Sequence, residues 1–212
     1  DSIEISDVTS TLGDLLTIDE NQFTVNSGTT NLLNLSLSSD TARQINGVLT
    51  INHNAPGSPM EVPISAVFRP DGATTIYVST TASDSNGGFT IDTPLASVQA
   101  AIDMALNGDT IEVRAGTYVE NINFNSKQLL LSGESAETTI IDGNWQGKTV
   151  NLNGPSTIQN FTITGGDGGR GSGMTITADD VTVKNCIFTD NKGSDGGDHI
   201  ASGGAQNLIV EN

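Results

Sequence analysis

The stretch GDTIEVRAGTYVENINF, residues 108–124, decides the fold of this chain. Its apolar residues form runs of five residues or fewer, in which apolar and polar side chains alternate and which Gly, Asn and Glu separate. This pattern is typical of short β-strands joined by turns. Strands this short do not form a stable sheet by themselves. We therefore expect them to pair with similar strands elsewhere in the chain.

Two sets of similar segments supply such partners. The first set consists of apolar triplets at Ile111–Val113, Leu129–Leu131, Val150–Leu152 and Met174–Ile176, with another near Ala201. The second set consists of TIQNFTI (157–163), TVKNCIF (182–188) and LIVEN (208–212). Repeats of this length, each with two or three short strands, predict a solenoid in which every strand pairs with the coil above and the coil below.

The second set also predicts which residues are stacked. It aligns Asn160, Asn185 and Asn212 in one column, at the same corner of successive coils. Asparagine amides can satisfy the backbone groups that a sharp turn exposes, which favours a structural ladder; a row of ligand-binding amides is the alternative. In the same register Phe161 and Phe188 are interior residues on adjacent coils.

One helix is expected, near residues 94–106. Thr93 or Asp92 can cap its N-terminus, and Pro94 suits the first helical position. An apolar stripe follows on one face, made of Leu95, Val98, Ala101, Ile102 and Ala105. We expect this helix to cover the first coil, because an open end would expose apolar side chains and unpaired strand edges.

The remaining sequence divides into two further parts. Residues 1–68 alternate apolar and polar side chains between Gly, Asn, Asp and Pro turns, which predicts antiparallel strands in a sandwich. Residues 69–74, RPDGAT, are polar and are interpreted as a linker. Residues 75–212 then form the solenoid with its capping helix.

The first part resembles a known module. FTVNSGTTNLLNLSLSSDTARQINGVLTINHNAPGSPMEVPISAVF is similar to the second half of a bacterial immunoglobulin-like module of the abnormal-spindle/hydin type. The matching motifs are G-x-L-x-I at Gly47–Ile51 and V-P-I-x-A at Val62–Ala66. The resemblance implies an immunoglobulin-like β-sandwich that lacks the family's first strand, and hence a fragment of a longer protein.

The second part resembles another family. TPLASVQAAIDMALNGDTIEVRAGTYVENINF is similar to the entry segment of right-handed parallel β-helix proteins of the pectin-lyase-like superfamily, and the likeness continues through TTIIDGN and IQNFTITGG. The resemblance implies an all-β chain: a partial sandwich, then the helix-capped N-terminal coils of a right-handed parallel β-helix, cut at residue 212. It does not choose a function, because lyases, methylesterases and surface adhesins share this fold.

The composition excludes several partners. Asp and Glu number 25 against eight Lys and Arg, so the formal net charge is −17. This charge repels nucleic acid and anionic membrane surfaces. No apolar run reaches the 18 residues of a membrane span, so we expect no membrane insertion. Cys186 is the only cysteine, which rules out a disulfide within the chain.

The polar residues suggest two kinds of chemistry. Asp190, Asp195 and Asp198 offer oxygen ligands for calcium, although their spacing is not that of an EF-hand loop. Lys184 and Lys192 are the basic residues that a polysaccharide lyase would use to remove a proton beside a uronate carboxylate. The glycine-rich stretch at 165–173 lacks the residues of a phosphate-binding loop, and we interpret it as a loose surface insertion.

Three functions stay open at this point. The favoured interpretation is a secreted or cell-surface bacterial protein whose β-helix is a rigid adhesive scaffold that binds polysaccharide or cell-surface glycans. The first alternative is a lyase with most of its site beyond residue 212, and the second is a stalk without a ligand. We expect no catalytic residues in this stretch, calcium as the one conceivable cofactor, and further domains of the same polypeptide as partners.

Overall fold

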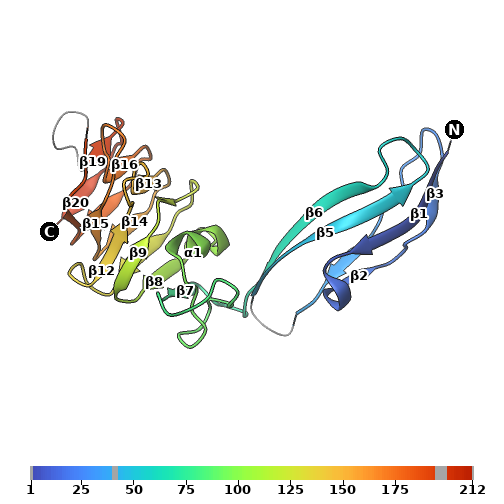
Figure 1. Ribbon diagram of the computed structural model, residues 1–212, viewed down its shortest axis with the longest axis horizontal. Helices are drawn as coiled ribbons and strands as arrows, with labels where there is room; N and C mark the ends of the chain where they lie inside the picture. Colours follow the sequence, from blue (N-terminus) through green and yellow to red (C-terminus); the bar gives the residue numbers. More distant parts are fainter. Residues whose placement is uncertain (1, 40–42, 194–199, 212) are drawn as a thin grey trace. The chain divides into compact units, whose positions relative to one another are not determined.

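The computed structural model describes residues 2–39, 43–193 and 200–211. The chain divides into two compact units, residues 1–68 and 69–212 (Figure 1). Strands pair antiparallel in the first unit and parallel in the second. The predicted all-β fold with a parallel β-helix is therefore confirmed.

The first unit is a pair of antiparallel sheets around a thin core. One sheet has the order β3-β1-β5-β6 and the other consists of β2 and β4. Their bounds are β1 Ile3–Ser10, β2 Leu16–Ile18, β3 Phe23–Val25, β4 Leu35–Leu37, β5 Arg43–His53 and β6 Met60–Phe68, with a 3-10 turn at Gly13–Leu15. Val8, Leu16 and Leu49 form the buried centre, with partly buried aliphatic side chains around them. The immunoglobulin-like assignment of this unit stays a prediction.

The segment interpreted as a linker begins inside the second unit. The Arg69 guanidinium donates from Nη2 to the Ala73 carbonyl at 2.7 Å and to Asp109 Oδ2 at 2.9 Å. It also lies 5.1 Å from the centre of the Phe89 ring. These contacts attach Arg69 to the start of the solenoid, and the assignment of residues 69–74 as a linker stays a prediction.

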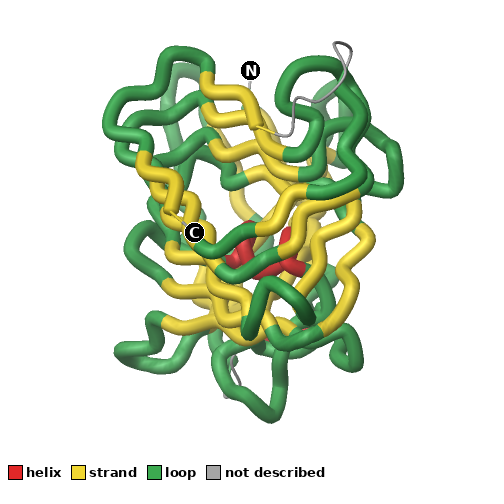
Figure 2. The backbone as a smooth tube through the Cα atoms, turned by 90° about the vertical axis from the view of Figure 1, so that its left-hand side faces the viewer, coloured by secondary structure: helices red, strands yellow, loops and turns green. Residues whose placement is uncertain are grey.

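The second unit is a solenoid of three parallel sheets, and each coil from β8 to β19 contributes one strand to each sheet, whereas β7 and β20 belong to the six-stranded sheet alone. A six-stranded sheet has the order β20-β17-β14-β11-β8-β7, and the other two have the orders β18-β15-β12-β9 and β10-β13-β16-β19. Figure 2 shows these strands side by side, with loops at the corners between sheets. The strand bounds are β7 Thr75–Val78, β8 Thr110–Val113, β9 Gly116–Val119, β10 Ile122–Asn123, β11 Leu130–Gly133, β12 Thr139–Asp142, β13 Val150–Leu152, β14 Thr157–Gln159, β15 Thr162–Thr164, β16 Met174–Ile176, β17 Thr182–Lys184, β18 Ile187–Phe188, β19 Ile200–Ser202 and β20 Ile209–Glu211.

The second predicted register agrees with the pairing, and the first register is correct only for its last three triplets, because Val150 pairs with Met174 and Thr175 with Ala201. Ile158 pairs with Val183 and Val183 with Val210, as the alignment of 157–163, 182–188 and 208–212 requires. The apolar triplets, however, come from two sheets, because Ile111 pairs with Leu131 while Val150 pairs with Ile122 and Met174. Each coil carries several similar apolar triplets, one in each sheet. Triplets with regularly increasing spacing in the sequence can therefore belong to different sheets.

The corners between sheets differ in length. The connections β8–β9, β14–β15 and β17–β18 each contain two residues, and β11–β12 contains five. The next corner is more variable, because β9–β10 contains two residues, β12–β13 seven and β15–β16 nine. The length changes therefore accumulate mainly at one corner, while paired strands keep their register.

The glycine-rich corner at 165–173 is packed at its two ends, which differs from its interpretation as a loose insertion, whereas Asp167, Gly168 and Arg170 in its middle are exposed. Gly166, Gly171 and Ser172 are buried. A Cβ on Gly166 would collide with the Ser172 carbonyl, so only glycine fits there. The glycines are needed because two backbone segments approach closely, which requires residues without side chains.

The core of the solenoid is a column of aliphatic side chains. The second residue of β7, β8, β11, β14 and β17 in the six-stranded sheet points inward, and four of these residues, Ile76, Ile111, Leu131 and Ile158, are fully buried. Each of these side chains stacks on its equivalent in the next coil because the strands are in register. Short strands are stable here because every coil buries its apolar residues against its neighbours.

The helix is shorter than expected. It spans α1 Val98–Met104, and its N-cap is Ser97, whose side chain accepts a hydrogen bond from the Ala100 N–H. Leu95 is fully buried and forms a β-bridge with Val78, which holds the preceding residues extended and prevents the helix from beginning at Pro94. The buried face of α1 packs against β7, β8 and β10 and so covers the first coil. No described helix has the length and apolar character that crossing a bilayer requires.

Candidate functional site

Polar side chains form a row on the outer face of the six-stranded sheet. In its strands the third residue faces outward, because the second residue points into the core and successive side chains alternate between the two faces of a sheet. Strand pairing places these positions next to one another. We call them the polar row: Tyr77, Glu112, Ser132, Gln159, Lys184 and Glu211.

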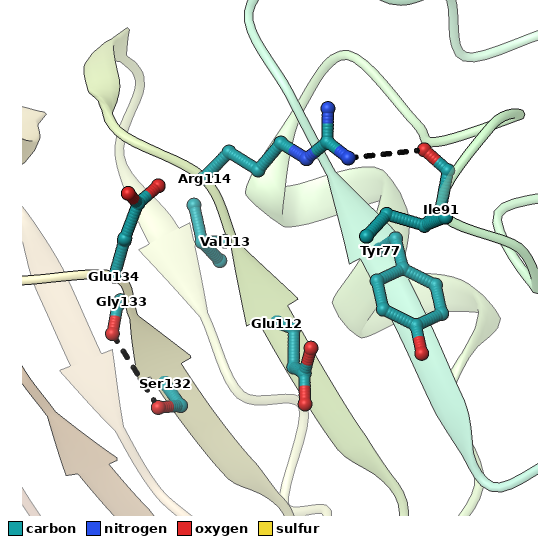
Figure 3. A pocket seen from close by; sticks show the side chains of 8 residues that line it. All are labelled: Tyr77, Ile91, Glu112, Val113, Arg114, Ser132, Gly133 and Glu134. Carbon is teal, nitrogen blue, oxygen red and sulfur yellow. Dashed lines mark hydrogen bonds between the residues drawn. The ribbon is translucent and has the colours of Figure 1, made fainter.

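A pocket of about 260 Å³ opens at the β7 end of this row. Figure 3 shows it between the Tyr77 ring, the Glu112 carboxylate and the side chains of Arg114 and Glu134. Ile91, Val113, Ser132 and Gly133 complete the lining. The pocket therefore combines one aromatic ring with carboxylates, a guanidinium and a hydroxyl.

Hydrogen bonds hold several of these polar groups in place. Glu134 Oε2 accepts the Ala115 N–H at 3.0 Å, which fixes its carboxylate beside Arg114. The Arg114 guanidinium donates to the Ile91 carbonyl at 3.4 Å, which directs it across the pocket. Further along the row Gln159 Nε2 donates to Ser132 Oγ at 3.1 Å. The site is therefore organised by strands and corners of adjacent coils.

A second pocket of about 380 Å³ adjoins the first through Glu134, which lines both. Its other lining residues include Glu137, Asn160 and Asn185, at the corner that follows the six-stranded sheet. The Ser135 hydroxyl donates to Glu137 Oε2 at 2.7 Å and lowers the pKa of that carboxyl. The polar surface thus continues from the row around this corner.

The predicted asparagine column lies at this corner. Asn160 and Asn185 have left-handed backbone angles, φ 63° and φ 49°. Asn185 Nδ2 donates to Asn160 Oδ1 at 3.2 Å, and Asn160 Nδ2 donates to the Gly133 carbonyl at 3.2 Å. These bonds join three successive coils, as a ladder would. Asn212 lies outside the described residues.

The two phenylalanines differ in burial. Phe161 is fully buried, whereas Phe188 is only half-buried, although it pairs with Ile163 as the register predicts. Phe188 belongs to β18, which in the described part of the chain has a neighbouring strand on one side only. The expectation of two equally interior rings must therefore be corrected for Phe188.

The structure does not bring the two candidate lysines together. Lys184 lies in the polar row, exposed, with Nζ 3.7 Å from Glu211 Oε2. Lys192 lies at the corner beyond β18, where its Nζ is 4.0 Å from the centre of the Trp145 ring and its backbone bridges to Asp167. Lys184 thus lies on the face of the six-stranded sheet and Lys192 at the corner beyond β18, and their role as catalytic bases stays a prediction.

The calcium hypothesis can be compared with the structure only in part. Asp190 is exposed, its carbonyl accepts the Gly165 N–H at 3.2 Å, and the Thr189 hydroxyl donates to its Oδ2 at 3.1 Å. Asp195 and Asp198 lie outside the described residues. Within residues 2–39, 43–193 and 200–211, no group of three or more His, Cys, Asp or Glu side chains is placed to hold a metal ion. Calcium binding at this corner stays a prediction.

The sequence interpretation missed most of the pocket. None of Tyr77, Glu112, Arg114 and Glu134 is among the candidate site residues that the sequence predicts. The signal was present, since each strand motif, such as TIYV, TIEV or TIQ, places an apolar residue second and a bulky or polar residue third. Only the register between strands shows that these third residues are neighbours.

Comparison with known proteins gives a partial match. Over 86 residues, 37% of this chain, the sequence is 41% identical to "Pectate lyase PEL9" of Emericella nidulans, and the match covers 21% of that protein. The chain thus spans about one-fifth of the length of this curated relative. No protein-family model and no solved structure matches the chain. The relative and the parallel solenoid together support a β-helix of the pectin-lyase-like kind.

Proposed function

We propose that this protein is a secreted or cell-surface polysaccharide-binding β-helix, in which the outer face of the six-stranded sheet contacts the glycan. The observation that carries the proposal is the polar row with the Tyr77 pocket at its end. The likeness to a protein named as a pectate lyase supports the general connection with polysaccharide.

The composition of the row suits sugar recognition. Hydroxyl, amide and carboxylate side chains exchange hydrogen bonds with sugar hydroxyls, and an aromatic ring packs against the C–H face of a sugar. Adjacent strands lie about 4.8 Å apart, so six successive positions extend over about 24 Å. A row of that length fits an extended polymer better than a single small molecule.

Rigidity is a further reason to favour binding. The row stands on paired strands whose inner side chains are buried, and Gln159 and Glu134 are held by hydrogen bonds. Groups held this way lose little conformational freedom on binding, which raises affinity. A solenoid that presents such a surface can act as an adhesive scaffold.

A lyase is the second candidate, because exposed Lys184 lies in the same row beside Glu211. Elimination needs a base within hydrogen-bond reach of the sugar proton and a group that neutralises the uronate carboxylate. Lys192, the other candidate base, contacts Trp145 at another corner. We therefore propose that residues 1–212 bind polysaccharide without cleaving it.

Binding is tested by affinity electrophoresis of the 212-residue chain through gels that contain neutral glucans, chitosan, polygalacturonate or alginate. Retardation by at least one polymer, reduced in Gln159→Ala, is expected. Asn151→Ala is the matched control, because Asn151 is a partly buried amide residue on β13 of another sheet. Equal retardation of Gln159→Ala and Asn151→Ala would contradict glycan binding at the outer face of the six-stranded sheet. If no polymer retards the chain, a structural stalk without a ligand is favoured.

Cleavage is tested with polygalacturonate and alginate, with and without calcium, by the absorbance of unsaturated products. We expect no increase in absorbance. If unsaturated product forms only with calcium and does not form with Lys184→Ala, the protein is a lyase and the proposal of binding without cleavage is wrong.

A further inference from the structure

We propose that the pocket at Tyr77 and Glu112 selects a glycan that carries free amino groups, as in glucosamine polymers, over one that carries carboxylates. This inference rests on the proposed function, because it names the ligand class of the same face. It starts from the charge of the pocket and the order of its side chains.

The lining of the two adjoining pockets is acidic. It contains the carboxylates of Glu112, Glu134 and Glu137, and its one cationic group among the described residues is the Arg114 guanidinium. The formal net charge of the whole chain is also negative, −17. A polyuronate would bring one further negative charge per sugar into this field, so its approach is disfavoured.

The position of Glu112 favours a cationic group. Its neighbours on the adjacent strands are Tyr77 and Ser132, so its carboxylate lies between an aromatic ring and a hydroxyl (Figure 3). An ammonium above Glu112 would form a charge-assisted hydrogen bond and lie beside the Tyr77 ring, whose face attracts cations.

The other groups of the pocket suit the rest of an amino sugar. The Tyr77 ring and the Ile91 side chain offer apolar surface to the C–H groups of a sugar ring. Ser132 can exchange a hydrogen bond with a sugar hydroxyl, and the Arg114 guanidinium can donate one to a hydroxyl oxygen. A pocket of about 260 Å³ has room for about one sugar unit of a chain that continues along the polar row.

The test compares three oligosaccharides of equal length and the same linkage, built from glucosamine, N-acetylglucosamine or glucose. These ligands differ only at the second carbon of each sugar, so a difference in affinity reports on the ammonium group. Titration calorimetry is performed at a pH between the ordinary pKa values of a glutamate and of the sugar amine. We expect the glucosamine oligomer to bind about tenfold more tightly than the glucose oligomer, and less so at high salt.

Two variants assign the effect to Glu112. Glu112→Gln keeps the shape of the side chain and should abolish the preference for glucosamine, whereas Glu112→Lys should shift the preference to galacturonate oligomers. Glu61→Gln is the control for net charge, because Glu61 is exposed on β6 of the first unit. Tryptophan emission and circular dichroism identical to those of the parent show that each variant is folded.

The outcomes separate this inference from the proposed function. A preference for glucosamine that is lost in Glu112→Gln and kept in Glu61→Gln supports it. Tighter binding of glucose or galacturonate oligomers overturns the amino-sugar inference but leaves polysaccharide binding in place. A preference that survives in Glu112→Gln overturns the assignment to this pocket, and no binding of any oligomer overturns both proposals.

Discussion

Replacing Phe161 by Ala tests whether the solenoid is stabilised by its stacked interior. The Phe161 side chain is fully buried, so the truncation removes apolar contacts and leaves a cavity. Phe→Ala changes at buried sites cost about 3–5 kcal/mol. We expect the upper part of that range, because the coils above and below are joined by β-pairing and cannot collapse into the space.

The matched comparison is Phe188→Ala on the next coil. Phe188 is half-buried, so fewer contacts are lost and solvent can fill the space. We expect its cost to be less than half that of Phe161→Ala, about 1–2 kcal/mol. The two variants share one chemical change, but Phe161 lies at the corner between β14 and β15 and is fully buried, whereas Phe188 lies in β18 and is half-buried.

Urea titration followed by tryptophan emission measures both variants. The chain has one tryptophan, Trp145, and it lies in the second unit, so the signal reports on the solenoid alone. The free energy of unfolding follows from linear extrapolation to zero urea. Equal losses for Phe161→Ala and Phe188→Ala, or a loss below about 1 kcal/mol for Phe161→Ala, would refute the stacked interior.

Two further changes test polar contacts of the solenoid. Asn191 is buried and its Oδ1 accepts the buried Gly166 N–H at 2.9 Å, so Asn191→Ala should lower the free energy of unfolding by about 1–3 kcal/mol; a loss near zero would contradict this role. Burial raises the pKa of Glu120, whose carboxylate accepts the Val98 and Gln99 N–H groups at the start of α1. A raised folded-state pKa means that Glu120 favours folding most below its unfolded-state pKa, and that this contribution is lost as pH rises through the folded-state value. The stability of Glu120→Gln relative to the parent should therefore increase as the pH rises above the ordinary glutamate pKa of about 4, and a difference that does not change with pH in urea titrations would exclude the effect.

The pattern of the individual strands was predictable from the sequence. Strand alternation depends on local order, and the aligned motifs around Ile158 and Val183 keep the same spacing from their corner asparagines. The sequence therefore identified the parallel pairing of these coils. It did not identify the pairing of Ile111 with Leu131, because the steps between paired residues from β8 to β20 are 20, 27, 25 and 27 residues, and the step from β8 to β11 is shorter than those that follow.

The start of the helix and the pocket depended on contacts between distant residues. Thr93 and Pro94 satisfy the local rules for a helix start, yet the burial of Leu95 against Val78 keeps the chain extended until Ser97. In the same way, no local rule connects Tyr77 with Glu112, which are neighbours only after the strands have paired. Tertiary packing overrides propensity in the first case and creates the site in the second.

The unequal corners of the solenoid have a consequence for how such a protein can change over generations. The connections that follow β9, β12 and β15 grow from two to seven to nine residues without moving the strands that they join. The closure entropy of a loop rises only with the logarithm of its length, so insertions there cost little stability. Mutation can therefore lengthen this corner coil by coil and change the chemistry of its surface, while the six-stranded sheet keeps its strands and its outer face unchanged.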